Sequence, residues 1–488
     1  MVRWLRRGAS HVALQGTIGF FFSLYIFGPI GAPITWALVL FWFAATRAVL
    51  AMTGPATARY AAPALAWSLA AAALLGAEYA KSVRFRGFVS RVPGLHLLGY
   101  LDGLWSGEMP WYLVVNMLVL RLISFTMDAQ WSGGAVPRGL AKDPPPDQYN
   151  WASPALARVQ AEGPAYKARV ATPRPAGEYA SPALLFAYAF YPPLLLSGPT
   201  TTFNAWASHL SKAQTSYSSW QLALYCARWA ACFGLLEVAM HWSPLFAFVK
   251  HRVFLALPLP PVYSAGMSWM HLNYLWLKFL VLWRGWALLE GFETPENMTV
   301  CVNNNFTIKG FWRGWHRSYN QWLVRYIYIP LGGSRVPLWR QLFNIAVVFT
   351  FVALWHDMTA QLLAWGWILV LGMAPELAAG AWAGSQHWAA VALRDSRWMR
   401  VLVGLGGAVN ILALVLANFI GYSASPEAAM GLLREVFLLP AGGLNLPLIL
   451  AMFAVLYSAV QLMLLRQAQD EDTSLRLLAW PGRSPKTA

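Results

Sequence analysis

Residues 8–46 read GASHVALQGTIGFFFSLYIFGPIGAPITWALVLFWFAAT and contain no Lys, Arg, Asp or Glu. A helix crosses a bilayer with about 20 apolar residues, so this stretch is long enough for two spans. Its middle, GPIGAP at residues 28–33, contains the residue types that turn a chain sharply. We therefore expect two membrane-spanning helices joined by a hairpin at residues 28–33.

The composition of the whole chain extends this interpretation. Of 488 residues, 58% are hydrophobic and 11% are charged, against roughly 25% charged residues in a typical soluble domain. So few charges cannot cover a water-facing surface, and the same composition excludes disordered and disulfide-stapled classes. Further apolar runs lie near residues 60–77, 110–127, 181–200, 219–249, 262–283, 341–356, 358–375, 401–422 and 444–465. The sequence predicts an all-α, polytopic integral membrane protein with about ten or eleven spanning or re-entrant helices.

The chain divides into four parts. Residues 1–128 form N-terminal transmembrane segments, and residues 129–178 contain eight prolines among charges of both signs. That proline density predicts an irregular surface loop. Residues 179–376 form a core that includes a polar, aromatic segment at 296–357. Residues 377–488 form C-terminal transmembrane segments and a short polar tail.

The net charge and the cysteine content indicate what the protein contacts and which cysteine roles are excluded. The net charge is +16, and the basic residues lie mostly between apolar runs. This placement indicates contact with anionic lipid head groups rather than with nucleic acid. Cys226, Cys232 and Cys301 are too few for a disulfide framework and lack a metal-binding spacing.

Charged and aromatic residues crowd together in residues 311–326, FWRGWHRSYNQWLVRY. Read as one helix, the segment places Arg313 and Arg317 on one face, and His316 and Asn320 on another. A third face is an aromatic stripe with spacings of 3, 4, 3 and 4, made by Trp312, Trp315, Tyr319, Trp322 and Tyr326. Such a helix suits the membrane interface, and an anchor helix without chemistry would have the same composition.

Residues 325–335, RYIYIPLGGSR, follow directly. Pro330 should end the helix, and the two glycines at 332 and 333 let the backbone approach a ligand. Arg325 and Arg335 flank the segment, so an anion such as a phosphate could bind between them. A plain tight turn before the next span is the alternative, and the sequence leaves both open.

His356 ends the charge-free run at residues 341–355. A desolvated imidazole needs polar partners, so a histidine at this place indicates a polar cavity. His316 lies 40 residues earlier and would meet His356 if the intervening turn brings the two helices together. Two histidines can act in base catalysis or bind a metal. No third ligand has a suitable spacing, so we predict no metal.

These residues resemble the membrane-bound O-acyltransferases (the MBOAT superfamily), in the branch of the glycerol uptake proteins and Hedgehog acyltransferase. The resemblance covers roughly residues 95–380 and is most specific where residues 311–334 combine with ALWHD at 353–357. It implies helices around an intramembrane cavity, with His356 as the catalytic histidine and His316 as its partner. Cys301 lies where the Hedgehog branch has a cysteine that can ligate haem.

The activity implied is transfer of a long-chain fatty acyl group from acyl-CoA to a hydroxyl of a lipid acceptor. The likeness to fungal glycerol uptake proteins implies lipid remodelling of GPI anchors in the endoplasmic reticulum membrane. His356 would be the general base, and His316 with Asn320 would orient the reactants or stabilise the oxyanion. The CoA phosphates would be held by Arg313, Arg317, Arg325 and Arg335.

Two alternatives come from the same resemblance. One is a transporter of a small polyol such as glycerol, or a regulator of its uptake. A transporter predicts two related halves with broken helices, and the sequence shows no such halves. The other is a protein acyltransferase of the Hedgehog type.

Two glycosylation patterns precede the basic stretch, at Asn297-Met298-Thr299 and at Asn305-Phe306-Thr307. Because Lys and Arg are retained in the cytosol, we expect the stretch at 313–340 to face that side. Both asparagines should then be unmodified, or too close to the bilayer to be reached.

Overall fold

The computed structural model describes residues 9–82, 107–133, 164–212, 218–291 except 252 and 258, 296–298, 301–385, 387, 389, 396–422, 426–439 and 442–479. Within them the chain is helical, apart from an isolated bridge between Leu438 and Leu444. Eight of the described helices are long and apolar enough to cross a membrane. The predicted all-α, polytopic membrane protein is confirmed.

The long helices are α1 (Ala9–Met52), α2 (Pro55–Ser82), α4 (Trp111–Ser132), α11 (Ser219–Trp242), α14 (Pro261–Glu290), α17 (Leu338–His356), α18 (Ala360–Ala383), α20 (Arg397–Tyr422) and α22 (Leu446–Ala479). The short ones are α6 (Pro164–Ala171), α7 (Ala176–Tyr179), α8 (Pro182–Ala189), α9 (Pro192–Leu196), α10 (Phe203–Ser211), α12 (Leu245–Lys250), α13 (Val253–Ala256), α15 (Ile308–Gly314), α16 (Arg317–Leu323), the π-helix η3 (Val324–Tyr328) and α21 (Pro426–Phe437).

Helix α1 is two antiparallel limbs that meet at Gly28, which has a φ of 71°. In an unbroken helix, Ser23 and Trp36 would be about 20 Å apart. Instead, Trp36 Nε1 donates to Ser23 Oγ at 2.8 Å, and the Trp36 ring stacks on Phe20 with centroids 4.4 Å apart. Close approach of Gly107 to the main chain at Gly28 leaves no room there for a Cβ atom. The predicted hairpin is confirmed, and α1 supplies two spans.

Two expectations about single segments are wrong. Residues 181–200 do not form one span, because the chain breaks after α8 and restarts at Pro192 as the short helix α9. Buried Arg121 donates to the last carbonyl oxygens of α8, at Tyr188 and Ala189, which ends that helix inside the protein. Residues 129–178 are not wholly irregular either, because Pro164 begins α6, in keeping with the tolerance of proline in a first helical turn. Residues 134–163 lie outside the described part of the chain.

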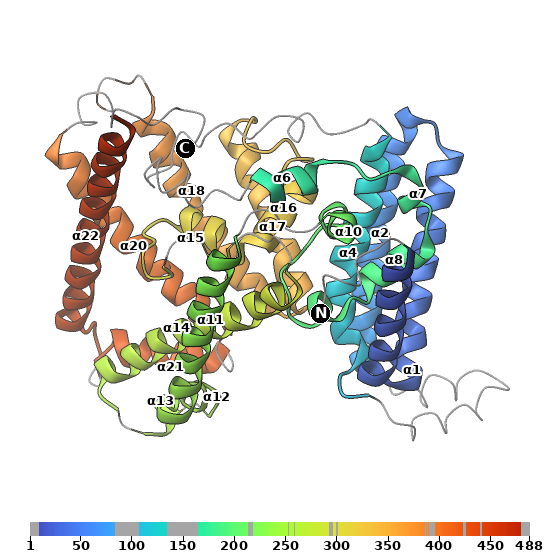
Figure 1. Cartoon of the computed structure of the whole chain (residues 1–488). Helices are drawn as coiled ribbons and strands as arrows, with labels where there is room; N and C mark the ends of the chain where they lie inside the picture. The colour runs from blue at the N-terminus through green and yellow to red at the C-terminus, as the bar shows by residue number, and fades with distance from the viewer. Residues whose placement is uncertain are drawn as a thin grey trace.

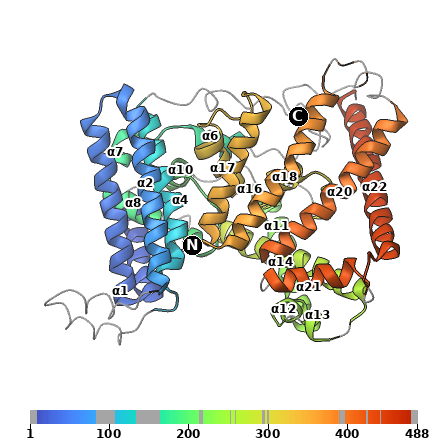
Figure 2. The ribbon, with the colours of Figure 1, turned by 180° about the vertical axis from the view of Figure 1, so that it is seen from behind.

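The helices stand in three groups (Figure 1). Helices α1, α2 and α4 form one side of the molecule, and α20 with α22 forms the other. Helices α17 and α18 stand between these groups in both views (Figure 2). The loop-and-helix segment α15–α16–η3 joins the middle group to α4.

The contact between α4 and η3 contains a buried ion pair. Arg325 Nη2 lies 3.0 Å from Asp128 Oδ1, and the Asp128 side chain is 0% exposed. The Tyr326 hydroxyl donates to the same oxygen at 3.0 Å. On the other side of the carboxylate, the Asn204 N–H at the start of α10 approaches Asp128 Oδ2 at 3.4 Å. One carboxylate therefore joins α4, η3 and α10.

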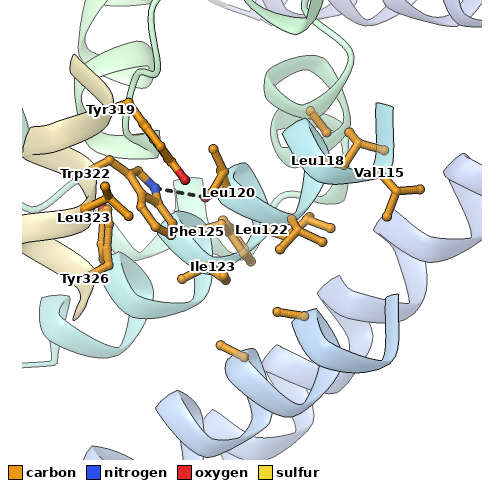
Figure 3. Packing of buried hydrophobic residues seen from close by; sticks show 14 of the residues in the cluster. Val115, Leu118, Leu120, Leu122, Ile123, Phe125, Tyr319, Trp322, Leu323 and Tyr326 are labelled. Atoms are coloured by element: carbon orange, nitrogen blue, oxygen red, sulfur yellow. Dashed lines mark hydrogen bonds between the residues drawn. The ribbon is translucent and has the colours of Figure 1, made fainter. Parts of the chain in front are cut away.

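Apolar packing surrounds this pair. Leu120, Leu122, Ile123 and Phe125 of α4 lie in the same buried cluster as Trp322 of α16 (Figure 3). The Trp322 indole donates to the Leu120 carbonyl oxygen at 3.1 Å, so the large ring is buried without an unsatisfied N–H. The cluster fixes α16 against the N-terminal group.

Breaking the ion pair from one side should destabilise the protein strongly. Asp128→Ala leaves the Arg325 guanidinium buried over Trp131 without its carboxylate. We expect a loss of roughly 3–5 kcal/mol in unfolding free energy, because an uncompensated buried charge remains. Thermal unfolding of the purified protein in detergent micelles measures it.

The control is Glu178→Ala, which removes the partly exposed Arg174–Glu178 pair at 2.8 Å. An exposed pair contributes at most about 1 kcal/mol, so this variant should melt close to the wild type. Equal melting of the two variants would show that the buried pair contributes no more than a surface one.

Candidate active site

The chain between α15 and α16 is bent at His316. Helix α15 ends at Gly314, and His316 has φ 42° and ψ 57°, the left-handed region. It is the one non-glycine residue with positive φ in the described part of the chain. Such a conformation costs an ordinary residue roughly 1–2 kcal/mol, so the surroundings must impose it. The prediction of a continuous helix over residues 311–326 is wrong.

The physical reason lies outside the segment. The Arg317 N–H donates to the carbonyl oxygen of Asn297 at 3.2 Å, instead of to a residue one turn earlier in the helix. The chain restarts as α16 from there. The spacing of the aromatic residues does not indicate this contact between Arg317 and Asn297.

The break also changes the role of the aromatic stripe. Tyr319, Trp322 and Tyr326 are buried, and Trp322 is 1% exposed. Trp312 belongs to α15 and packs edge-to-face on Trp365 of α18, with centroids 5.4 Å apart. Four of the five stripe residues belong to the buried core or pack against it, so the expected membrane-interface helix is not what this segment forms.

His316 contacts two helices, α14 and α16. Its ring stacks on Trp283 of α14 with centroids 3.7 Å apart and lies 5.5 Å from the Tyr319 ring. Its Nδ1 lies 3.4 Å from Ser318 Oγ, which itself accepts the Thr200 N–H at 3.1 Å. His316 lies outside the membrane-spanning helices, and burial, followed by the charge of His356, lowers its pKa to about 3. The His316 imidazole is therefore neutral at physiological pH.

His356 is the last residue of α17 and is exposed. Its Nδ1 lies 2.8 Å from the Val352 carbonyl oxygen. A carbonyl oxygen only accepts, so Nδ1 carries the proton in the neutral ring. The tautomer fixed in this way leaves the Nε2 lone pair of His356 free to accept a proton.

Aromatic rings connect the two histidines. Tyr319, beside His316, lies 4.6 Å from Trp355, and Trp355 lies 4.7 Å from His356, measured between centroids. The structure thus brings His316 and His356 into one region, although they come from different helices. Asn320 is one turn beyond His316, and its N–H donates to the His316 carbonyl oxygen at 3.0 Å.

Two contacts that sequence reasoning missed hold the end of α17. Asn116 of α4 donates to the Trp355 carbonyl oxygen, and Trp355 Nε1 donates to the Asn116 carbonyl oxygen at 2.7 Å. Lys81 of α2 lies 2.6 Å from Asp357 Oδ1. The polar Asn116 within an apolar run is a signal that could have been found. Lys81, at the end of a helix, gives none.

The four arginines do not form one group. Arg325 is paired with Asp128 inside the protein. Burial, and then the positive charge of Arg317, lower the pKa of Arg313. Arg335 is exposed, beyond the turn formed by Gly332 and Gly333 with φ values of 110° and 60°.

Further contacts support the interpretation of residues 330–335 as a tight turn. The Gly333 N–H donates to the Tyr328 carbonyl oxygen at 2.9 Å, and Asn344 of α17 donates to the Leu331 carbonyl oxygen at 3.2 Å. These bonds fold the segment onto its own neighbours. Binding of a phosphate there stays a prediction.

Cys301 lies at a turn, with an exposed thiol. Its carbonyl oxygen accepts from Asn304 N and Asn305 Nδ2 at 2.8 and 3.2 Å. A haem plane needs an apolar enclosure, and the described residues do not give this exposed thiol one. Among the described residues, no three His, Cys, Asp or Glu side chains gather as a metal site.

The chain belongs to the membrane-bound O-acyltransferase family, whose sequence pattern matches residues 106–397. It is 32% identical to membrane-bound O-acyltransferase gup1 of Schizosaccharomyces pombe over 85% of this chain and 66% of that protein. Identity to GUP1 of Saccharomyces cerevisiae is 32%, over 75% of this chain and 61% of that protein. Identity to mouse protein-cysteine N-palmitoyltransferase HHAT is 28%, over 42% of each chain. The chain thus spans less than two thirds of the length of these relatives.

The surroundings of Asn297 and Asn305 predict that neither is glycosylated. Asn297 is 5% exposed, and Asn305 Nδ2 donates to the Cys301 carbonyl oxygen. Oligosaccharide transfer needs an accessible amide nitrogen. We expect no gel shift when the protein, expressed in cells, is treated with a glycosidase. A known glycoprotein from the same cells is the positive control. A shift that Asn297→Gln or Asn305→Gln abolishes would place the segment in the lumen.

Proposed function

We propose that this protein transfers a long-chain acyl group from acyl-CoA to a hydroxyl of a lipid acceptor. One observation carries the proposal: the bond of His356 Nδ1 to the Val352 carbonyl oxygen leaves Nε2 of an exposed ring free as a base. The names of the fungal relatives, membrane-bound O-acyltransferases, support the same reaction.

His356 Nε2 would take the proton of the acceptor hydroxyl as its oxygen attacks the thioester carbonyl carbon. The carbon–sulfur bond then breaks, and the protonated His356 returns the proton to the leaving CoA thiolate. The products are an oxygen ester and free CoA. Family resemblance assigns His356 the same place.

His316 suits the role of oxyanion donor. Ser318 Oγ accepts the Thr200 N–H, so its own hydrogen is free to point at His316 Nδ1. That arrangement places the proton of the neutral ring on Nε2, as a hydrogen-bond donor. A neutral donor held by stacking on Trp283 stabilises negative charge without itself reacting. Asn320, on the next turn, would assist in orienting the reactants.

Arg313 and Arg317 are the better candidates for the CoA phosphates, because the charge of Arg317 acts on Arg313 and neither side chain is fully buried. Arg335 is exposed and would add to the attraction. Arg325 is already paired with Asp128, so we assign it a structural role in place of the predicted phosphate contact.

The acceptor and the compartment rest on the resemblance to fungal glycerol uptake proteins. It supports a lipid of the GPI-anchor type and the endoplasmic reticulum membrane. The apolar composition, with 58% hydrophobic residues, agrees with substrates that reach the site from the bilayer. Membrane lipids and acyl-CoA would then be the partners of the chain.

Substituting His356 tests the reaction. His356→Ala should lower kcat on the order of 100-fold or more, because the base is lost while the fold is kept. Release of free CoA by the purified protein, with long-chain acyl-CoA and a lipid extract as acceptor, measures the rate. His241→Ala, in the exposed part of α11, is the matched control and should retain the wild-type rate.

Lipid profiles of cells lacking the protein, rescued by the wild type or by His356→Ala, identify the acceptor. Full rescue by a well-expressed His356→Ala protein would remove His356 from the mechanism. A protein acceptor in place of a lipid would move the chain to the Hedgehog-type alternative.

The basic pair makes a separate prediction. Replacing Arg313 and Arg317 by Gln should raise KM for acyl-CoA several-fold more than it lowers kcat, since the attraction that is lost acts equally on the bound substrate and on the transition state. The effect should shrink at high salt, where screening already weakens phosphate contacts. Steady-state kinetics at two ionic strengths measure both. Unchanged KM values would place the phosphates elsewhere.

A further inference from the structure

The side chain of Asn297 is buried without a hydrogen-bond partner. It is 5% exposed, and among the described residues neither Oδ1 nor Nδ2 meets a donor or acceptor. Nearly all buried amides in proteins are paired, because water no longer compensates their polar atoms. An amide with both ends unsatisfied therefore indicates a partner other than the described residues.

The main chain that carries this amide is held on two sides. The Asn297 carbonyl oxygen accepts the Arg317 N–H at 3.2 Å. The preceding residue, Glu296, accepts from the Tyr225 hydroxyl at 3.0 Å and from Arg228 at 3.1 Å, both on α11. These contacts fix Asn297 directly against the bend at His316.

Other asparagines of the same stretch are paired. Asn303 Nδ2 donates to Asn273 Oδ1 at 2.7 Å, and Asn305 Nδ2 donates to the Cys301 carbonyl oxygen. If Asn297 served packing alone, a leucine of similar volume would fill the place without unpaired polar atoms. The main chain of Asn297 bonds to Arg317, the residue after His316, so the unpaired amide belongs to a residue next to the candidate site. This placement points to the substrate as its partner.

The chemistry of the amide indicates which part of the substrate it would bind. A carboxamide offers N–H donors and a C=O acceptor, and a secondary amide is their complement. The pantetheine arm of acyl-CoA carries such an amide, separated from the thioester sulfur only by a short ethylene link. A hydroxyl of the acceptor would pair with one end of Asn297 and leave the other unsatisfied.

We propose that Asn297 binds the pantetheine amide nearest the thioester and so positions the thioester carbon beside His316 and His356. This inference rests on the proposed acyl-CoA-dependent reaction. It makes Asn297 a residue that selects the donor rather than a base or an oxyanion donor.

Two truncated donors with the same acyl chain test the contact. The N-acetylcysteamine thioester keeps the amide, and the S-pentyl thioester replaces it by methylene groups of matched length. The wild type should prefer the amide donor in kcat/KM. Asn297→Leu should reduce that preference about 10-fold, as the loss of a buried hydrogen-bonding partner does. Asn303→Leu, in the same stretch, is the control and should keep the wild-type preference.

A stability measurement separates this role from a structural one. Removing an unpaired buried amide should leave the melting temperature of Asn297→Leu unchanged or raised. If the leucine variant does not fold, Asn297→Asp, which keeps the shape but loses the N–H donors, takes its place with the same two donors.

An unchanged donor preference in either folded variant would overturn the inference. Equal transfer from both donors by the wild type would also overturn the inference. The proposed function would still stand in that case. A wild type that transfers from no thioester, acyl-CoA included, would remove the proposed function and this inference together.

Discussion

The buried carboxylate of Asp128 is the constraint on which the candidate site depends. A charge in a wholly enclosed place persists only with a paired charge and further hydrogen bonds. Asp128 obtains them from Arg325 and Tyr326 of η3, and from the start of α10. Tyr326 also bonds to Ser124 at 3.0 Å, which receives the Phe203 N–H at 2.9 Å. Since η3 continues directly from α16, this network sets where the helix after His316 lies against α4.

The features that the sequence predicts are those that depend on residues close together in the chain. The hairpin at Gly28 follows from glycine and proline between two apolar runs, and the Ser23–Trp36 contact confirms it. The spans, the turn after Pro330 and the family resemblance are likewise visible in short stretches. The sequence also predicts that His316 and His356 lie in one region, because each is a polar residue within or at the end of an aromatic or apolar run.

The features that were missed depend on residues far apart in the chain. Asp128 and Arg325 are separated by 197 positions, and Asn116 and Trp355 by 239. The break at His316 was hidden because aromatic spacings of 3 and 4 are those of an unbroken helix. Only the bond from Arg317 to Asn297 shows why the helix stops. The phosphate role predicted for Arg325 had the same origin, because nothing near Arg325 in the sequence indicates its carboxylate partner.

The two histidines are held by different parts of the molecule, and that division fits a site between two substrates. The end of α17, with His356, is fastened to α2 and α4 through Lys81 and Asn116. His316 is instead held by Trp283 of α14. The left-handed His316 costs folding free energy, and this cost persists only when packing imposes it. A protein that keeps this strained residue in the same region as the exposed His356 imidazole retains its geometry at the expense of stability, as the proposed reaction between two bound groups would require.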